Sequence, residues 1–214
     1  MQVEIWSDVV CAWCYIGKRR FEEALDSFAG RADVEVTWRS FELDPEGSPE
    51  PIPLTQLLAE KYDIDGEQAA ERHARTTATA AGVGLELHLD RALSGNTFDA
   101  HRVIQLARAH GLQAAAQERL FGAYFSEGLP ISDRDTLVQL AVSVGLAADE
   151  VRSMLESDRF AAEVRDDELT AARFGISGVP FFVLDRRIGL SGAQPVEVML
   201  GALEQAEAEA ARAD

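Results

Sequence analysis

The sequence predicts an α/β protein in which a long helical block interrupts a domain built around one sheet. Strand patterns occur only near the two ends of the 214-residue chain. Between them, residues 54–174 carry helical spacing throughout, after a stretch at 44–53 with four prolines. A pair of cysteines marks the point where the first strand pattern changes into a helix pattern.

The N-terminal segment is predicted to be a β-α-β unit. Residues 3–6 alternate as a short strand, and residues 34–39 alternate as a second one. Between them, from about 13 to 28, apolar residues recur on one face of a helix. Because the connection is long, we expect the two strands to be parallel, with a right-handed crossover.

The middle of the chain is predicted to be all-helical. We expect helices near 54–62, 66–81, 98–110, 113–126, 133–144, 147–155 and 158–174, with glycines between many of them. The proline-rich residues 44–53 form the linker that leads into this block. No repeat is visible within it.

The C-terminal segment returns to strand patterns. Residues 179–184 form an apolar run interrupted by Pro180, and residues 188–190 suit a short returning strand. A last helix begins near Val196, and its acidic tail from Glu204 is expected to be exposed and frayed. Both ends together complete one sheet. We therefore expect one domain from 1–43 and 175–214, with an inserted helical domain at 44–174.

The charge balance limits the possible partners. Thirty-seven acidic residues against 20 Lys and Arg give a net charge of −17 and a pI of about 4.6. Nucleic acid and anionic membranes both need a positive surface, so neither is expected as a partner. The chain enters a strand pattern at once, without a basic segment followed by an apolar one. We expect a cytoplasmic protein, in which a structural disulfide would be unusual.

The two cysteines form the motif Cys11-Ala12-Trp13-Cys14 at the expected helix start. A thiol there meets free backbone N–H groups and the positive end of the helix dipole, and both favour the thiolate that attacks disulfides. Residues three apart in a helical turn are close enough to form and break a disulfide. We assign Cys11 as the exposed nucleophile and Cys14 as the shielded, resolving cysteine. Ala12 and Trp13 add no charge, so they leave the redox potential open.

Three other interpretations of the pair remain: half of a zinc site, inert core thiols, and a structural disulfide. A closed zinc site needs four ligands, and the chain has no third cysteine. Its four histidines are scattered along the predicted helical block: His73, His88, His101 and His110. We therefore expect no metal.

The basic run at 18–20 is interpreted as a solvated helix face.

Pro180 is the second candidate. A proline inside a strand-like run is usually found on an edge strand. From spacing alone, a trans peptide bond before it is the better prediction, since few X–Pro bonds are cis.

Four segments together resemble the DsbA-like branch of the thioredoxin superfamily, and within it the cytosolic FrnE-type proteins. They are the Cys11-Ala12-Trp13-Cys14 motif, residues 96–102 (Asn-Thr-Phe-Asp-Ala-His-Arg), residues 177–183 (Ser-Gly-Val-Pro-Phe-Phe-Val) and residues 191–195 (Ser-Gly-Ala-Gln-Pro). The resemblance covers essentially the whole chain. It implies a thioredoxin fold with a large all-helical insertion and a cis-Pro180 that faces the dithiol. The substrate-binding residues that it implies are Ala12, Trp13, Val179, Phe98 and His101. For His101 the alternative stays open that it is a helix histidine making an ordinary hydrogen bond.

The resemblance implies a thiol–disulfide oxidoreductase acting on protein or small-molecule thiols and disulfides, as a monomer or homodimer. No tightly bound cofactor is expected, and glutathione is the candidate co-substrate. The alternative comes from a related branch on the same scaffold, the kappa-class glutathione transferases and hydroxychromene-carboxylate isomerases. Such a protein would be a glutathione-dependent isomerase or transferase acting on a small aromatic metabolite. A non-catalytic binding module is the third hypothesis.

Overall fold

The computed structural model describes residues 1–62 and 65–213, which form two compact units. The first comprises Met1–Leu43 and Asp167–Asp214, and the second Asp44–Asp166. The second boundary lies earlier than the expected one, because residues 167–174 pack on the sheet. Asp167 forms an ion pair with Arg39 at 2.9 Å, and the Phe174 ring meets Trp6 edge-on.

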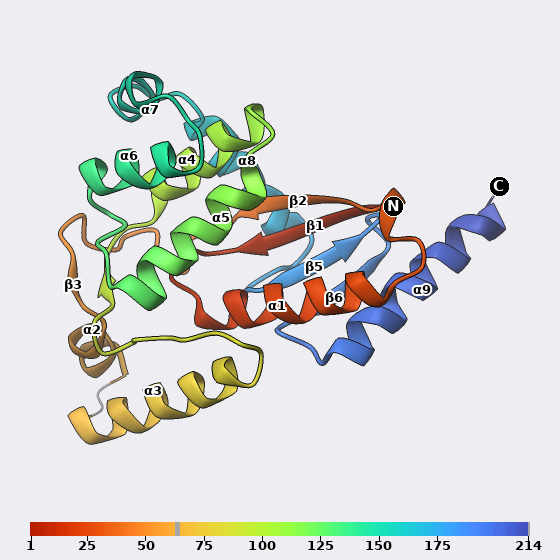
Figure 1. Cartoon of the computed structure of the whole chain (residues 1–214), viewed down its shortest axis with the longest axis horizontal. Coiled ribbons are helices and arrows are strands. Elements are labelled where there is room, and N and C mark those ends of the chain that lie inside the picture. Colours follow the sequence, from red (N-terminus) through yellow and green to blue (C-terminus); the bar gives the residue numbers. More distant parts are fainter. Residues whose placement is uncertain (63–64, 214) are drawn as a thin grey trace. The chain divides into compact units, whose positions relative to one another are not determined.

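The first unit is built on a four-stranded sheet in the order β2-β1-β5-β6 (Figure 1). Strand β1 (Gln2–Ser7) pairs in parallel with β2 (Glu35–Ser40) and antiparallel with β5 (Phe181–Leu184). Strand β6 (Ile188–Ser191) continues the sheet antiparallel to β5. The parallel β-α-β unit and the two C-terminal strands that the sequence predicts are confirmed.

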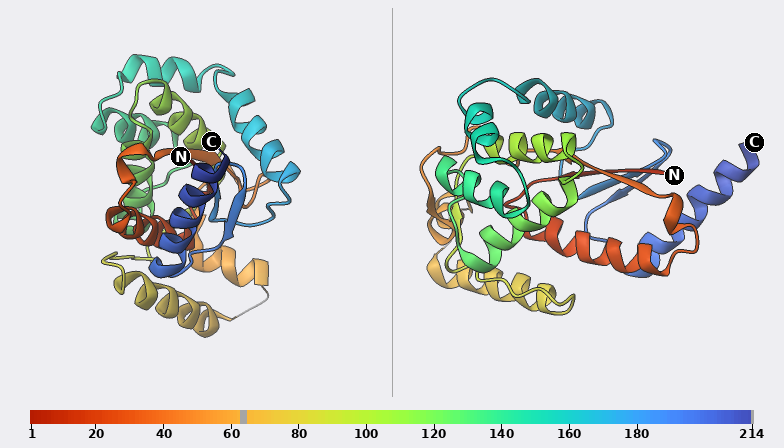
Figure 2. Two further views of the ribbon diagram at one scale, coloured as in Figure 1. Left: turned by 90° about the vertical axis from the view of Figure 1, so that its right-hand side faces the viewer. Right: turned by 45° about the horizontal axis from the view of Figure 1, so that its top comes forward.

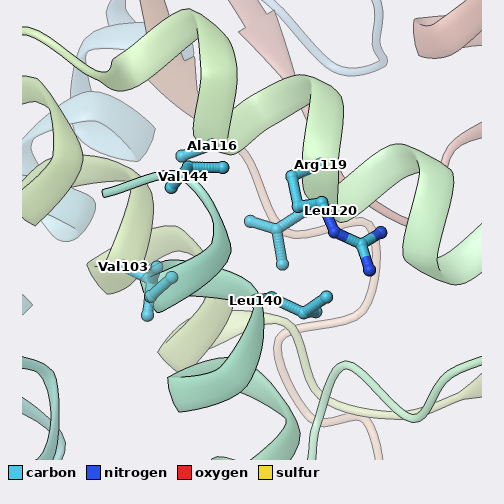
Figure 3. Close-up of a pocket in the computed structure, with 7 residues that line it drawn as sticks. Val103, Ala116, Arg119, Leu120, Leu140 and Val144 are labelled. Atoms are coloured by element: carbon cyan, nitrogen blue, oxygen red, sulfur yellow. The ribbon is translucent and has the colours of Figure 1, made fainter. Parts of the chain in front are cut away.

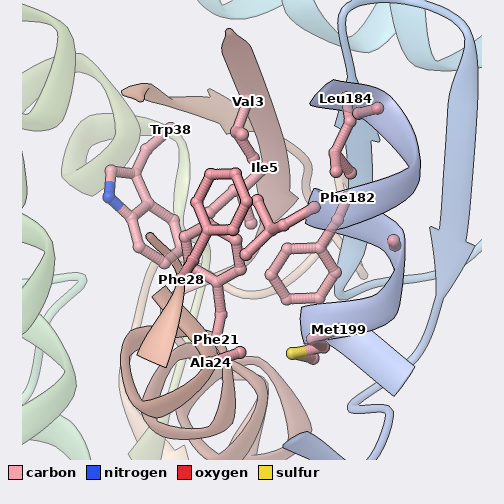
Figure 4. Close-up of a cluster of buried hydrophobic side chains, with 12 residues drawn as sticks. Val3, Ile5, Phe21, Ala24, Phe28, Trp38, Phe182, Leu184 and Met199 are labelled. Atoms are coloured by element: carbon pink, nitrogen blue, oxygen red, sulfur yellow. The ribbon is translucent and has the colours of Figure 1, made fainter. Parts of the chain in front are cut away.

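Helices α1 (Ala12–Ser27) and α9 (Val196–Ala213) lie side by side on one face of this sheet (Figure 2). Alternate strand residues such as Val3 and Ile5 point toward them and are fully buried (Figure 4). The core on this face is completed by Phe21, Ala24, Phe28, Trp38, Phe182, Leu184, Met199, Ala202, Leu203 and Ala206.

Helix α9 continues to Ala213, so the expected fraying from Glu204 is wrong. Alanine and glutamate favour the helix, and Ala206 packs into the core.

The opposite face of the sheet carries a smaller apolar cluster beside a group of charges. Trp6 packs with Ala171, Ile176 and Val183, where Ala171 comes from the last part of α8 (Ala161–Arg173). The Trp6 indole N–H donates to the backbone oxygen of Asp167 at 2.9 Å. This hydrogen bond satisfies the one polar group of a fully buried side chain.

The second unit is helical, as the sequence predicts. Its helices are α2 (Leu54–Tyr62), α3 (Gly66–Ala81), α4 (Phe98–Ala109), α5 (Gln113–Gly122), α6 (Arg134–Ser143), α7 (Ala148–Leu155) and the first part of α8. A π-helical turn, Ala123–Glu127, follows α5. The sequence did not predict the short ribbon in which β3 (Ile52–Pro53) pairs antiparallel with β4 (Leu93–Ser94). Two-residue strands are too short to leave an alternation pattern.

Helices α4, α5 and α6 meet around a small hollow in the second unit (Figure 3). Apolar side chains line it, together with Arg119: Val103, Ala116, Leu120, Leu140, Ala141 and Val144. It has no room for a water molecule, so it is a packing defect rather than a ligand site.

Arg102 on α4 holds the second unit together at one point. Its buried guanidinium donates to the backbone oxygens of Met154 (2.5 Å), Ser157 and Arg159 (3.0 Å), and it pairs with Asp99 at 2.7 Å. Carbonyls at the end of α7 and in the following turn thereby find a charged donor.

None of the helices within residues 1–62 and 65–213 is long and apolar enough to cross a bilayer.

On the sheet of the first unit, the buried carboxylate of Glu4 is paired with two arginines, the partly buried Arg39 and the exposed Arg186. Its carboxylate receives hydrogen bonds from Arg39 (2.5 and 2.9 Å) and from Arg186 (2.8 and 3.1 Å). Burial alone would raise the pKa of Glu4, but Arg186 and Arg39 together outweigh it and hold this pKa below its ordinary value. The folded state therefore favours the carboxylate.

This pairing predicts that part of the free energy of unfolding depends on pH. A depressed pKa contributes stability that is present above the unfolded value and is lost as the pH falls through the folded one. We expect Glu4→Gln to lower the free energy of unfolding by about 3 kcal/mol at neutral pH, and by less at a pH below the ordinary glutamate pKa of 4.5, where the carboxylate becomes protonated. Urea denaturation at both pH values measures this. Glu197→Gln, at an exposed position of α9, is the control for loss of one negative charge. An equal loss at both pH values would contradict the prediction.

Candidate active site

The loop between β1 and α1 holds the dithiol in place. Cys11 is the N-cap residue of α1, in an extended conformation, so its side chain lies where the first helical N–H groups have no partner within the helix. The Cys11 N–H donates to the Asp8 carbonyl at 3.1 Å. Asp8 is itself fully buried, and its carboxylate accepts the Leu43 N–H at 2.7 Å. The loop is thus fixed to the segment that follows β2.

Both cysteines are free thiols, and they differ in access. Cys11 is 7% exposed and Cys14 is 1% exposed. The order is the one that the sequence predicts, but Cys11 is not the openly exposed thiol expected. Val179 lies against it, because the Cys11 thiol donates to the Val179 carbonyl oxygen at a distance of 3.6 Å.

The segment that covers Cys11 contains the second candidate, Pro180. The Val179–Pro180 peptide bond is cis, as the resemblance implies and against the expectation from spacing alone. Pro180 is buried and Val179 half-buried. The Pro180 carbonyl oxygen accepts the Gly192 N–H at 2.8 Å. Four residues predicted from the sequence therefore meet at one place: Cys11, Cys14, Val179 and Pro180.

Cys14 is held mainly in its protonated form. Burial raises the pKa of the Cys14 thiol well above its ordinary value, and the neighbouring Cys11 sulfur adds to this through a hydrogen bond and through its charge. Two donors act in the opposite direction and lower this pKa: the Asp8 backbone N–H and the Ser7 hydroxyl. Ser7 ends β1 and is buried, so its hydroxyl contacts the sulfur from inside the protein.

The two residues between the cysteines differ in exposure. Ala12 is half-buried, whereas the Trp13 side chain is 46% exposed. A large apolar side chain left this exposed beside the two thiols is available to contact a bound molecule. Their assignment as substrate-binding residues stays a prediction.

Phe98 and His101 belong to α4 of the second unit. His101 is almost fully buried, and its backbone N–H donates to the Thr97 backbone carbonyl at 3.0 Å. Phe98 is half-buried, with the Arg165 guanidinium 4.3 Å from its ring centre. Their expected place at the substrate groove stays a prediction.

The basic run at 18–20 is not the solvated face that the sequence suggested. Lys18 is 5% exposed and pairs with Glu22 at 2.5 Å. Arg20 donates to the backbone oxygen of Ala193 at 2.5 Å. Charge alone could not show this, because the partner carbonyl is 173 residues away.

Gly17 was also missed, although the sequence held a signal for it. Glycine inside a helix is less favourable than alanine by about 1 kcal/mol, so its presence within the pattern at 13–28 suggests a close approach. A Cβ at Gly17 would lie 3.0 Å from Pro180 Cγ.

Metal binding has no further support in the described part of the chain. Within residues 1–62 and 65–213, no group of three or more His, Cys, Asp or Glu side chains could hold a metal ion.

Comparison with known proteins gives consistent matches along the chain. Residues 2–204 match the family model of the DSBA-like thioredoxin domain. A probable DsbA oxidoreductase from Streptomyces coelicolor is 46% identical, with a TM-score of 0.94 over 98% of this chain and 91% of that one. The cytosolic disulfide reductase DsbM from Pseudomonas aeruginosa, solved with GSH, is 20% identical, with a TM-score of 0.66 over 96% and 98% of the chains. A 2-hydroxychromene-2-carboxylate isomerase is 14% identical, with a TM-score of 0.73 over the whole of both chains. The last two likenesses concern the fold alone.

The Ser7 contact generates a prediction about Cys14. In a Cys11→Ser background, Ser7→Ala should raise the pKa of Cys14 further, because a donor to the thiolate is lost. A hydrogen bond to a charged group contributes about 1.5–3 kcal/mol, so alkylation of Cys14 at neutral pH should slow roughly tenfold or more. Thiolate absorbance and alkylation rates against pH measure both effects. Ser7→Thr keeps the hydroxyl and is the control. Identical titrations of the Ala and Thr variants would show that the hydroxyl does not act on Cys14.

Proposed function

This chain belongs to the DSBA-like thioredoxin domain family, and we propose that it is a cytoplasmic thiol–disulfide oxidoreductase that works through Cys11 and Cys14. The observation that carries the proposal is the meeting of the dithiol with the cis-proline segment, where Cys11 Sγ lies 3.6 Å from the Val179 carbonyl oxygen. A more accessible sulfur stands at the helix end, with a buried one behind it. That asymmetry suits one attacking and one resolving thiol.

The proposed reaction proceeds in two exchanges. The Cys11 thiolate attacks one sulfur of a substrate disulfide, the S–S bond breaks, and the other sulfur leaves as a thiolate. Cys14, once deprotonated, then attacks the Cys11 sulfur and releases the second substrate thiol. The products are the Cys11–Cys14 disulfide and two substrate thiols, so two electrons have passed to the substrate. The reverse sequence oxidises a dithiol.

Binding of the substrate is proposed to use the backbone at Val179 and the exposed Trp13. An extended peptide or a small thiol beside Val179 would bring its sulfur close to Cys11. Ala12, Phe98 and His101 are proposed as further contacts. The dithiol itself carries the electrons, so no tightly bound cofactor is required. Glutathione is proposed as a co-substrate, which is in keeping with the DsbM structure with GSH. That relative is described as cytosolic, which supports the proposed compartment.

A second function is a glutathione-dependent isomerase or transferase acting on a small aromatic metabolite. The full-length likeness to the 2-hydroxychromene-2-carboxylate isomerase favours it, as does the exposed indole of Trp13. The two functions differ in their need for Cys14. Calorimetric titration shows whether glutathione binds, and a turnover assay of the Cys14→Ser variant shows whether the activity needs Cys14. Together the two measurements separate the functions. Saturable glutathione binding with turnover that does not need Cys14 would favour the isomerase.

The dithiol mechanism predicts different outcomes for its two cysteines. Cys11→Ser should reduce exchange with a peptide disulfide to the uncatalysed rate, because the attacking sulfur is gone. Cys14→Ser should still attack and should accumulate a mixed disulfide at Cys11, which mass spectrometry detects. Equilibration of the wild type in glutathione buffers then gives the potential of the pair. Exchange activity that survives in Cys11→Ser would overturn the proposal.

A further inference from the structure

One segment of the first unit links α1 to Pro180, and its residues come from the Ser-Gly-Ala-Gln-Pro motif at 191–195. Gly192 has φ +80°, a conformation that favours glycine, and its N–H donates to the Pro180 carbonyl at 2.8 Å. The Gln194 side chain closes the turn by donating to the Ser191 carbonyl at 2.6 Å. We call residues 191–195 the brace.

Helix α1 contacts the brace and Pro180 through two of its residues. Arg20 donates to the Ala193 carbonyl at 2.5 Å. Gly17, one turn before Arg20, has no side chain, and this lets the helix backbone approach. A Cβ there would lie 3.0 Å from Pro180 Cγ and 3.5 Å from both Cα and Cβ of Ala193. The Pro180 atom belongs to a ring in a buried residue, so it cannot swing aside as a flexible side chain would.

Helix α1 and its N-cap residue therefore contact the proline segment and the brace at two places along the helix. At its N-terminus, the Cys11 thiol reaches the Val179 carbonyl. Two turns later, Gly17 sets how closely Pro180 can approach, and Arg20 holds the brace that bonds to Pro180. A Cβ at Gly17 would require a shift of a few tenths of an ångström at the Pro180 contact, and loss of the Arg20 donor would release the brace from the helix. Either change acts on the segment whose backbone lies beside Cys11 Sγ.

We propose that Gly17 and Arg20 are positioning residues that set the gap between the Cys11 sulfur and the Val179–Pro180 backbone, Gly17 through its direct contact with Pro180 and Arg20 through the brace. The inference rests on the proposed exchange function and extends it, because this gap determines how an extended disulfide substrate presents its sulfur to Cys11. Neither residue touches the reacting atoms. Their effect falls on substrates that lie along Val179, since alignment to within about 1 Å can change such rates by roughly 100-fold.

The test compares two reactions of Cys11 in the same variants. Exchange with a peptide disulfide needs the proline segment, whereas alkylation by iodoacetamide needs only the thiol. We expect Gly17→Ala to lower kcat/KM for the peptide disulfide roughly tenfold or more without slowing alkylation. Gly201→Ala on α9 is the matched control, because nothing lies within 4 Å of a Cβ there. It should exchange as the wild type does.

Arg20 gives a second, milder variant in case Gly17→Ala folds poorly. Arg20→Met should lower exchange, Arg20→Lys should restore most of it by donating to Ala193, and Arg19→Met is the control. Arg19 pairs with Glu22 on the same helix. Because both residues act on the same proline segment and both contact Ala193, the effects of Gly17→Ala and Arg20→Met should be non-additive.

The outcomes separate this inference from the proposed function. A wild type that exchanges no peptide disulfide would overturn the function, and the inference with it. An active wild type with equally active Gly17→Ala and Arg20→Met variants would overturn the inference alone. So would variants in which alkylation and exchange fall together, since that indicates a general loss of structure.

Discussion

The antiparallel pairing of β1 with β5 is the constraint on which the site depends. In this register Trp6, near the end of β1, lies opposite Phe181, at the start of β5. The end of β1 and the start of β5 therefore lie at the same end of the sheet. The chain leaves β1 there toward the dithiol, and it enters β5 there from the proline segment. Cys11 and Val179 are 168 residues apart in sequence, yet their side-chain sulfur and backbone oxygen are hydrogen bonded. The inserted residues 44–166 leave this pairing intact, because they fold as a unit of their own.

Two requirements meet on helix α1. Its inner face must be apolar to pack on the sheet, and Phe21, Ala24 and Phe28 meet that need. In the proposed exchange its N-terminus must also present sulfur atoms, at a helix end where backbone N–H groups and the helix dipole favour negative charge. Close packing at Gly17 connects the two, because the core that fixes the helix also fixes its distance from Pro180.

Local patterns in the sequence predicted most of the fold and the centre of the site. Helical and strand periodicities are local, so nearly every helix and the four strands of the sheet were found. Cys11 and Cys14 were predicted from their spacing and their place at a helix start, which suit the proposed thiol–disulfide exchange. The partner of Arg20 could not be found in this way, since it is a backbone carbonyl far along the chain. Residues 167–174 share the helical spacing of the block before them, and only tertiary contacts assign them to the first unit.

The environment of Cys14 makes its reactivity depend on the stage of the proposed exchange. Burial and the Cys11 sulfur raise its pKa, while the Ser7 hydroxyl and the Asp8 N–H lower it. Once Cys11 is tied up in a mixed disulfide, its sulfur carries no charge, and its contribution to the raised pKa disappears. Burial and the two donors remain. The Cys14 thiolate therefore becomes easier to form at the step in which it must attack, whereas in the free dithiol it stays protonated and leaves Cys11 as the nucleophile.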